Sequence, residues 1–271
     1  MKRREFLTAT CLAGIAPLSQ ITSAQQKKPD KVKRAGGRKP KSRREYYELK
    51  QYHIETEEQK KRFDGFMREA AIPAMNRLGI EPVGVFYMIE GLSPVYVLLR
   101  HKTLKSILTL NAQLLKDDLF LRKGTAFLDT LSSEPAYKRV CSSLMVAFRG
   151  MPRLEVPITK AERIFQLRTY ESHSMKAGRK KIEMFNKGEI NIFRKTGLHP
   201  VFFGETLVGS ELPNLTYMLG FENMEESKAN WSKFINDPDW KKLRAIPEYA
   251  DEKIISHITN IYLRPAVYSQ I

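Results

Sequence analysis

The sequence predicts an α+β protein built from two tandem ferredoxin-like modules, each with the order β-α-β-β-α-β, which pack together as an α+β barrel. Two observations support this class. Residues 163–171 have a weaker copy at residues 46–53, with Leu49 standing 118 positions before Leu167. After each copy, the apolar periodicity gives the same succession of strands and helices, and that succession is the ferredoxin-like one.

The first module is expected over residues 45–150. Residues 46–53 alternate as a half-buried strand does, and apolar residues at three- and four-residue spacing then predict a helix over 57–78. Pro73 lies inside that helical pattern and should kink or divide it. The other elements expected in this module are strands over 82–87, 95–100 and 142–148, a helix over 104–115 and a shorter helical piece after Asp118.

The second module is expected over residues 161–271. Its elements are strands over 165–171, 201–205, 215–221 and 258–263, a helix over 177–195, and a second helix that turns Trp231, Phe234 and Ile235 inward. Asp237 should cap a new short helix that begins at Pro238, since a proline at the first helical position loses no hydrogen bond. Trp240 would then be fixed against the core.

The net charge of +16 is concentrated near the N-terminus. Residues 1–44 hold thirteen Lys and Arg against Glu5 and Asp30, a balance of +11, which leaves +5 for residues 45–271. The body of the chain is therefore only mildly basic and does not present the basic face of a nucleic-acid binder. We expect no nucleic-acid partner.

Residues 1–24 resemble a twin-arginine export signal. Arg3 and Arg4 precede Phe6 and Leu7, a modestly apolar stretch follows, and Ala24 is a small residue that suits a signal peptidase. An ordinary secretory signal that carries two arginines is the alternative. Either interpretation predicts an exported protein of the periplasm or cell envelope.

Residues 25–44 carry Lys or Arg at ten positions and almost nothing apolar, so we expect a disordered linker. It is either a solvated spacer or a segment that adheres to an anionic envelope surface. With Cys11 inside the predicted signal, Cys141 is the single remaining thiol, and no intramolecular disulfide can form. The five histidines show no metal-ligand spacing, so no metal site is expected.

Three stretches resemble the NIPSNAP family, within the dimeric α+β barrel group. They are Leu167-Arg168-Thr169-Tyr170-Glu171, Gly197-Leu198-His199-Pro200 and Asp237-Pro238-Asp239-Trp240, and the resemblance covers residues 163–263. The first module departs from it, because Lys50-Gln51 stands where Arg-Thr would be expected. The resemblance implies two sheets packed face to face. Related barrels bind small organic molecules or haem, and some are monooxygenases.

A site is expected in the space between the two sheets. Side chains alternate across a strand, so Phe165 and Leu167 should face the helices while Arg168 and Tyr170 face the inter-sheet space. The candidate ligand-binding residues are Arg168, Tyr170, Lys50, Tyr52 and Glu205. A buried arginine needs an anionic partner. Arg168 therefore either pairs with an internal acid such as Glu48 or Glu205, or binds an anionic or carbonyl-bearing ligand beside Tyr170.

The sequence thus predicts an exported protein that binds a small organic ligand between two sheets or acts as an interaction protein. The alternative is a monooxygenase-like oxidoreductase, either cofactor-free or haem-dependent. No phosphate loop, dinucleotide fingerprint or nucleophile elbow occurs, and the sequence identifies neither a cofactor nor a catalytic residue. It also leaves open whether the barrel forms within one chain or between the chains of a homo-oligomer.

Overall fold

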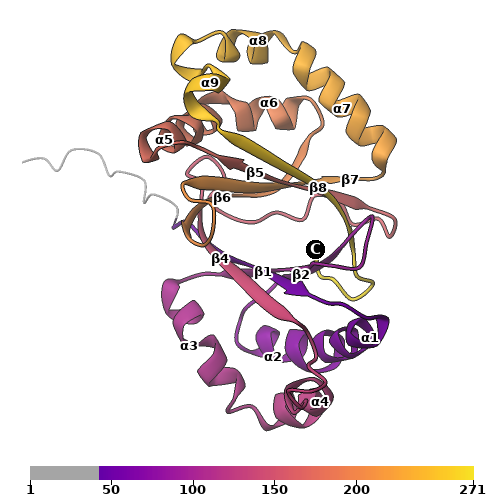
Figure 1. Ribbon diagram of the computed structural model, residues 1–271. Coiled ribbons are helices and arrows are strands. Elements are labelled where there is room, and N and C mark those ends of the chain that lie inside the picture. Colours follow the sequence, from indigo (N-terminus) through magenta and orange to yellow (C-terminus); the bar gives the residue numbers. More distant parts are fainter. Residues whose placement is uncertain (1–42) are drawn as a thin grey trace, which may run out of the picture. The chain divides into compact units, whose positions relative to one another are not determined.

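The computed structural model describes residues 43–271 (Figure 1). The predicted export signal at 1–24 lies outside the described residues, as does the predicted linker at 25–44 except for its last two positions. We refer to residues 46–147 as the N-terminal half and to residues 164–265 as the C-terminal half.

The N-terminal half contains β1 (Tyr46–His53), α1 (Glu57–Phe66), the π-helical turn η1 (Met67–Ala71), α2 (Ile72–Arg77), β2 (Val83–Met88), β3 (Val95–His101), α3 (Leu104–Leu114), α4 (Asp118–Leu128) and β4 (Arg139–Ala147). The C-terminal half contains β5 (Ile164–Glu171), α5 (Met175–Met184), the π-helical turn η2 (Phe185–Glu189), α6 (Ile190–Lys195), β6 (His199–Val208), β7 (Asn214–Phe221), α7 (Met224–Asn236), α8 (Pro238–Arg244), η3 (Pro247–Tyr249), α9 (Asp251–Ile254) and β8 (His257–Pro265).

The two halves share element bounds. β1 and β5, α1 and α5, η1 and η2, and α2 and α6 all begin and end 118 positions apart. The strand order is also shared, β4-β1-β3-β2 in one half and β8-β5-β7-β6 in the other. Equivalent residues are therefore 118 positions apart over these elements. β3 and β7 are not related by this spacing. There, two residues are called equivalent when their strand partners on β1 and β5 are equivalent.

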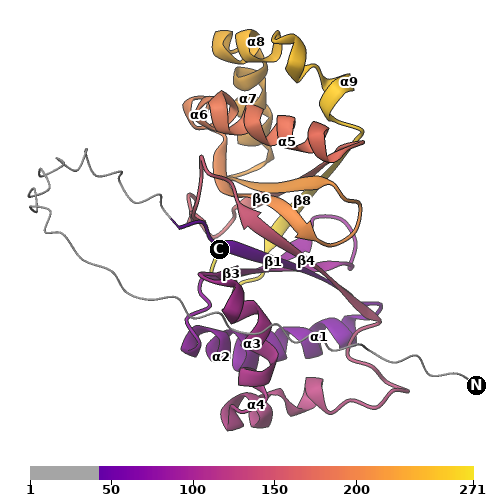
Figure 2. The same cartoon turned by 90° about the vertical axis from the view of Figure 1, so that its left-hand side faces the viewer.

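Eight antiparallel strands form a closed barrel in the order β1-β3-β2-β8-β5-β7-β6-β4. Two seams join the halves, one where β2 pairs with β8 and one where β4 pairs with β6. The barrel therefore closes within a single chain. Figures 1 and 2 show the helices of the two halves on opposite sides of the strands.

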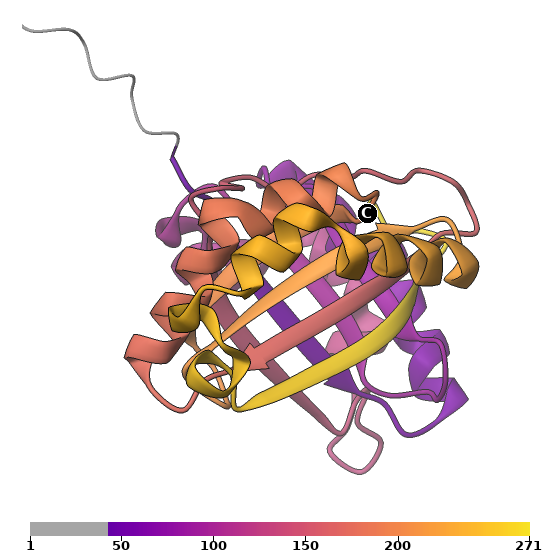
Figure 3. The same cartoon turned by 90° about the horizontal axis from the view of Figure 1, so that it is seen from above.

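Both faces of each sheet pack against apolar residues over most of their length, with exposed stretches at the start of β4 and along β8. The outer faces pack against the helices of their own half, and Figure 3 shows the helices of the C-terminal half lying across the strands beneath them. The inner faces meet in a second apolar core, whose members include Tyr47, Leu49, Phe86, Phe165, Leu167, Phe202, Met218 and Ile271. The central strands thus form a layer between two cores.

The helix predicted over 57–78 is interrupted by η1, just before Pro73. The proline is not the cause, because η2 interrupts the C-terminal helix at the equivalent place, where Asn191 replaces Pro73. The interruption was predicted, but the reason given for it was wrong. Among residues 43–271, the structure has no helix that combines the length and the apolar character needed to cross a membrane.

Candidate functional site

A pocket of about 460 Å³ lies in the C-terminal half, between the outer face of the sheet and the helices. Strands β5 and β8 form its floor, and its walls come from α5, η2 and the segment from α7 to α9. Its lining includes Gln166, Arg168, Tyr170, Lys181, Glu189, Trp231, Phe234, Trp240, Arg244, Asp251, Asn260 and Tyr262. The volume suits a small organic molecule.

Arg168 and Tyr170 belong to this pocket, so the prediction that they face the inter-sheet space is wrong. The alternation along the strand was predicted correctly, but its direction was reversed, because Phe165 and Leu167 lie in the barrel core. In a barrel covered by helices both faces of a strand are buried, so apolar character alone does not indicate which face points inward. Arg168 and Tyr170 lie between the sheet and the helices, where polar partners are available.

The Arg168 guanidinium lies between two aromatic rings. Its Cζ is 4.9 Å from the centre of the Trp231 ring and 5.4 Å from that of Tyr170, and its Nη2 donates to the Tyr170 hydroxyl at 3.0 Å. Its Nε is buried and has no hydrogen-bond partner among residues 43–271. The guanidinium is therefore held rigidly and keeps an unused donor.

Arg168 has no carboxylate partner among the described residues, contrary to the predicted pairing with Glu48 or Glu205. Glu48 pairs with Lys50 at 2.6 Å, and Glu205 lines a different pocket, beneath α5. Lys50 and Arg168 are equivalent residues, as are Glu48 and Gln166. The cation of the N-terminal half thus has an acid two residues away, and the C-terminal half carries an amide at that place.

The Tyr170 hydroxyl accepts two hydrogen bonds, one from Arg168 and one from the Tyr217 hydroxyl at 3.1 Å. A phenolic oxygen that accepts twice keeps its own proton for a third partner. Tyr217 is fully buried, and burial raises its pKa well above the ordinary value, so it remains a neutral donor. Tyr170 is therefore a second available donor in the pocket, next to Arg168 Nε.

Lys181 and Glu189 form an ion pair at 2.9 Å whose side chains are 2% and 3% exposed. Lys181 also lies over the ring of Phe185 at 4.6 Å. Burial raises the pKa of Glu189, and the neighbouring ammonium of Lys181 opposes that shift. The pocket lining carries three cations, Arg168, Lys181 and Arg244, against two carboxylates, Glu189 and Asp251, and Arg168 forms no ion pair among residues 43–271. The pocket therefore has one positive charge in excess.

A hydrogen-bonded chain fixes the pocket floor. Trp231 Nε1 donates to Gln166 Oε1 at 2.7 Å, and Gln166 Nε2 donates to Asn260 Oδ1 at 2.8 Å. This chain holds the Trp231 indole over Arg168. Ile235, predicted to point inward with Trp231, is instead 54% exposed at the end of α7.

The structure does not bring the five candidate residues together. Arg168 and Tyr170 share the pocket described above, whereas Lys50 and Tyr52 line a smaller one of about 200 Å³ in the N-terminal half. That second pocket is mainly apolar. Phe63 occupies the place equivalent to Lys181, Ala71 that of Glu189, and Val97 that of Tyr217.

Sequence reasoning missed Lys181, Glu189 and Trp231 as site residues. A signal was present, because Lys181, Phe185 and Glu189 follow one another at four-residue spacing and so lie on one stripe of the helix. Two opposite charges on a stripe that is otherwise apolar are unusual in a buried helix face. The sequence did not indicate that this stripe is the helix face that packs on the sheet.

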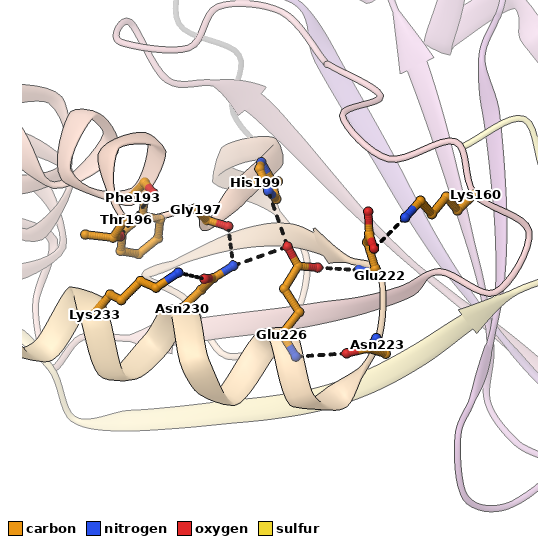
Figure 4. A network of polar contacts seen from close by, with 10 residues as sticks. All are labelled: Lys160, Phe193, Thr196, Gly197, His199, Glu222, Asn223, Glu226, Asn230 and Lys233. Carbon is orange, nitrogen blue, oxygen red and sulfur yellow. Dashed lines mark hydrogen bonds and ion pairs between the residues drawn. The ribbon is translucent and has the colours of Figure 1, made fainter.

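The Gly197-Leu198-His199-Pro200 motif has a structural explanation, shown in Figure 4. Gly197 ends the α6 segment at φ +83°, and its carbonyl accepts from Asn230 Nδ2 at 2.9 Å. Asn223 caps α7, and Glu226 reaches back to the backbone N–H of Glu222. His199 Nε2 lies 3.7 Å from Glu226 Oε1. The motif therefore fixes the chain between α6 and β6 against α7.

The pocket does not have the donor set of a haem site. None of its lining residues is a histidine, cysteine or methionine, the side chains that most often bind haem iron. Within residues 43–271, no group of three or more His, Cys, Asp and Glu side chains is arranged to hold a metal ion.

Comparisons with known proteins agree with this geometry. The NIPSNAP family model matches residues 165–270, and no curated protein matches the chain. A candidate monooxygenase from Lactobacillus acidophilus NCFM has a TM-score of 0.54 at 8% identity, over 82% of this chain and 94% of its own. One from Fusobacterium nucleatum has a TM-score of 0.53 at 8% identity, over 83% and 93%.

An uncharacterized NIPSNAP-like domain protein from Burkholderia xenovorans is 19% identical, with a TM-score of 0.35, over 40% of this chain and 88% of its own. The candidate monooxygenases share the fold of the whole barrel, whereas the family model covers one half of it. The half of the barrel that holds the Arg168 pocket is the part of this chain that matches the NIPSNAP family.

Proposed function

We propose that this chain binds a small planar carboxylate, such as an aromatic acid, in the Arg168 pocket. The observation that carries the proposal is the unbalanced guanidinium of Arg168, whose Nε has no partner among the described residues. Arg168 is partly buried, and a charge that is largely withdrawn from water without an ionic partner is unfavourable. A bound anion would remove that cost.

The donors are arranged for such an anion. Arg168 and Tyr170 line the pocket from the same face of one strand, and the Tyr170 hydroxyl has no acceptor among the described residues. A carboxylate can accept from both, since each of its oxygens takes more than one hydrogen bond. Trp231, Phe234 and Trp240 line the same space and suit a planar apolar body.

The N-terminal half supports the same conclusion. There the equivalent cation Lys50 is neutralised by Glu48, and apolar residues replace the buried polar ones. The fold therefore does not require Arg168, Lys181 or Glu189 for packing. We infer from the shared bounds and strand order that the halves are tandem ferredoxin-like modules, of which only the second has kept a site.

A second candidate function, a cofactor-free oxidoreductase, is favoured by one observation. The buried acid–base pair of Lys181 and Glu189 lies in the same pocket as Arg168, and the candidate monooxygenases share the barrel fold. A phenol or enol bound there would have its anion stabilised by Arg168. Oxygen uptake with catechol or hydroquinone tests this function, and uptake no faster than autoxidation excludes it for those substrates.

The carboxylate proposal is tested by calorimetric titration of the full chain with benzoate, using benzamide as the uncharged control. We expect benzoate to bind and benzamide to bind at least about tenfold more weakly, because only the carboxylate neutralises Arg168. Arg168→Gln should weaken benzoate binding about ten- to a hundredfold. Equal binding of both probes, or unchanged binding by Arg168→Gln, would contradict the proposal.

Gln166→Glu is the sharpest variant. It supplies the carboxylate that Glu48 provides in the N-terminal half, so it should neutralise Arg168 internally and abolish benzoate binding without unfolding the chain. Lys50→Arg in the N-terminal half is the matched control, since Glu48 remains beside it, and it should leave benzoate binding unchanged. A Gln166→Glu variant that binds benzoate as well as the wild type would refute the assignment of the anion to Arg168.

A further inference from the structure

Helix α3 exposes an apolar stripe on its outer side. Leu104, Leu108 and Leu115 recur at spacings of four and seven, which places them on one face, and they are 42%, 84% and 63% exposed. The opposite side of α3 is apolar too, and there Leu110 is buried in the core of the N-terminal half. Figure 1 shows α3 at the periphery of the helices of that half.

The charges on α3 itself and on the residues directly flanking it are positive. Lys102, Lys105 and Lys116 are exposed beside it, and the sequence of α3 contains no Asp or Glu. The acids that follow it are Asp117, which pairs with Arg77, and Asp118 at the start of α4. This surface combines exposed leucines with lysines that form no ion pair among the described residues. It is complementary to a partner that has an apolar interior and an anionic surface layer.

The equivalent helix of the C-terminal half has a different surface. The helix caps Thr103 and Asn223 align α3 with α7, so that Lys228 stands where α3 has Leu108. Glu225 and Glu226 also give the first turn of α7 a negative charge. The other two stripe positions, Leu104 and Leu115, correspond to Met224 and Ile235, and Ile235 is 54% exposed, so the two helices differ at the centre of the stripe. The exposed Leu108 is therefore not required by the position of this helix in the fold.

We propose that α3 docks the chain onto the surface of an anionic lipid bilayer, with the three leucines entering the interface and the three lysines lying against headgroup phosphates. A helix of 11 residues is too short to span a bilayer but suits an interfacial position. A second copy of the chain fits less well. In a symmetric contact α3 would face itself, bringing lysines together without a carboxylate in the helix to pair with them.

The test is co-sedimentation of the full chain with vesicles of phosphatidylcholine, with and without phosphatidylglycerol. We expect binding to the vesicles that contain phosphatidylglycerol. The double variant Leu108→Glu/Leu115→Glu should lower the bound-to-free ratio at least about tenfold. Met175→Glu/Val267→Glu is the matched control, because it adds the same charge at apolar residues that are 79% and 100% exposed elsewhere, and it should bind as the wild type does.

A tryptophan at the stripe gives a direct readout. When anionic vesicles are added, the fluorescence of the new tryptophan in Leu108→Trp, obtained by subtracting the wild-type spectrum, should shift to shorter wavelength. That of Lys228→Trp, at the equivalent position of α7, should not shift. The basic N-terminal sequence is identical in all these variants, so differences among them report α3 alone. Equal sedimentation of both double variants would overturn the proposal. So would a dimer, seen by light scattering, that Leu108→Glu disrupts while vesicle binding is unaffected.

Discussion

The two halves of this barrel use their helix-covered spaces differently. In the C-terminal half, Lys181 and Glu189 lie buried between helix and sheet, whereas Phe63 and Ala71 occupy the equivalent places in the N-terminal half. The bounds of β1 and β5, those of β4 and β8, and the π-helical turns are shared by both halves. The difference teaches that this framework tolerates an apolar interior at the places where the C-terminal half has a buried ion pair.

The outer surfaces of the helices α3 and α7 also differ, and here the N-terminal half is the one with an exposed apolar residue at the centre. The half with the apolar interior exposes Leu108 on α3, and the half with the polar interior carries Lys228 at that place on α7. A single framework thus presents a polar pocket in one half, and in the other an outer helix whose exposed centre is a leucine where α7 has a lysine. Exchanging residues between equivalent positions tests each side of this comparison.

The largest effect is expected from breaking the buried ion pair. Lys181→Phe introduces the residue of the N-terminal half but leaves Glu189 buried without a counter-ion, and we expect a loss of about 3–5 kcal/mol in the free energy of unfolding. Lys181→Phe/Glu189→Ala imports both residues and should recover most of that loss. Urea unfolding measures both variants, and a double variant as unstable as the single one would show that the interiors are not interchangeable.

The cost of Lys181→Phe should shrink as the pH falls. Burial raises the pKa of Glu189 above 4.5, so the folded chain binds this proton at a higher pH than the unfolded chain does. Stability therefore increases as the pH falls from the raised value towards 4.5. Urea unfolding of the single and double variants at a series of pH values measures this effect, because the difference between their free energies of unfolding should narrow as the pH falls, while other titrating groups contribute equally to both.

An effect of the opposite sign is expected at His101 in the N-terminal half. Burial lowers its pKa from 6.5 to about 4, so the unfolded chain binds a proton that the folded chain rejects between these values. The stability that depends on neutral His101 is present above pH 6.5 and is lost by up to about 3 kcal/mol as the pH falls to 4.

His101→Phe removes this titration by importing Phe221, the equivalent residue of the C-terminal half. The free energy of unfolding of the variant should fall less steeply between pH 6.5 and 4 than that of the wild type. Urea unfolding across this range is the measurement. Parallel pH profiles of the variant and the wild type would mean that the pKa of His101 is the same in the folded and the unfolded chain.

The smallest effect concerns the glycines that end the two equivalent helices. Gly79 and Gly197 have φ of +74° and +83°, and an added Cβ meets no atom within 4 Å at Gly79 but lies 3.0 Å from Asn230 at Gly197. Gly79→Ala should cost about 1 kcal/mol from the backbone conformation. Gly197→Ala should cost about 1 kcal/mol more from the contact.

Thermal unfolding of the two alanine variants measures this difference. Gly197→Ala/Asn230→Ala serves as the control, because it removes the contact together with the hydrogen bond from Asn230 to the Gly197 carbonyl. Equal melting temperatures for the two single variants would show that Asn230 moves aside at no cost.

The sequence predicted much of the local structure. The 118-residue spacing, the strands at 46–53 and 165–171 and the cap at Asp237 were all readable, and Asp237 does accept hydrogen bonds from the N–H groups of Asp239 and Trp240. These features depend on residues close together in the chain, where side-chain alternation and helix capping operate. The prediction that Arg168 and Tyr170 share one face of a strand was confirmed for the same reason.

Only the tertiary structure decided which way that face points. The sheet is buried on both sides, so the polarity of a strand residue does not distinguish the barrel interior from the space beneath the helices. Arg168 contacts Tyr170 on its own strand and Trp231 of α7, and Tyr170 is held in turn by Tyr217 of β7. The missing partner of Arg168 is defined by comparison with Glu48 in the other half. By itself the sequence determined the two halves and their alternating strands. The closure of the barrel within one chain, and the pocket beneath its helices, depended on contacts between residues far apart in the chain.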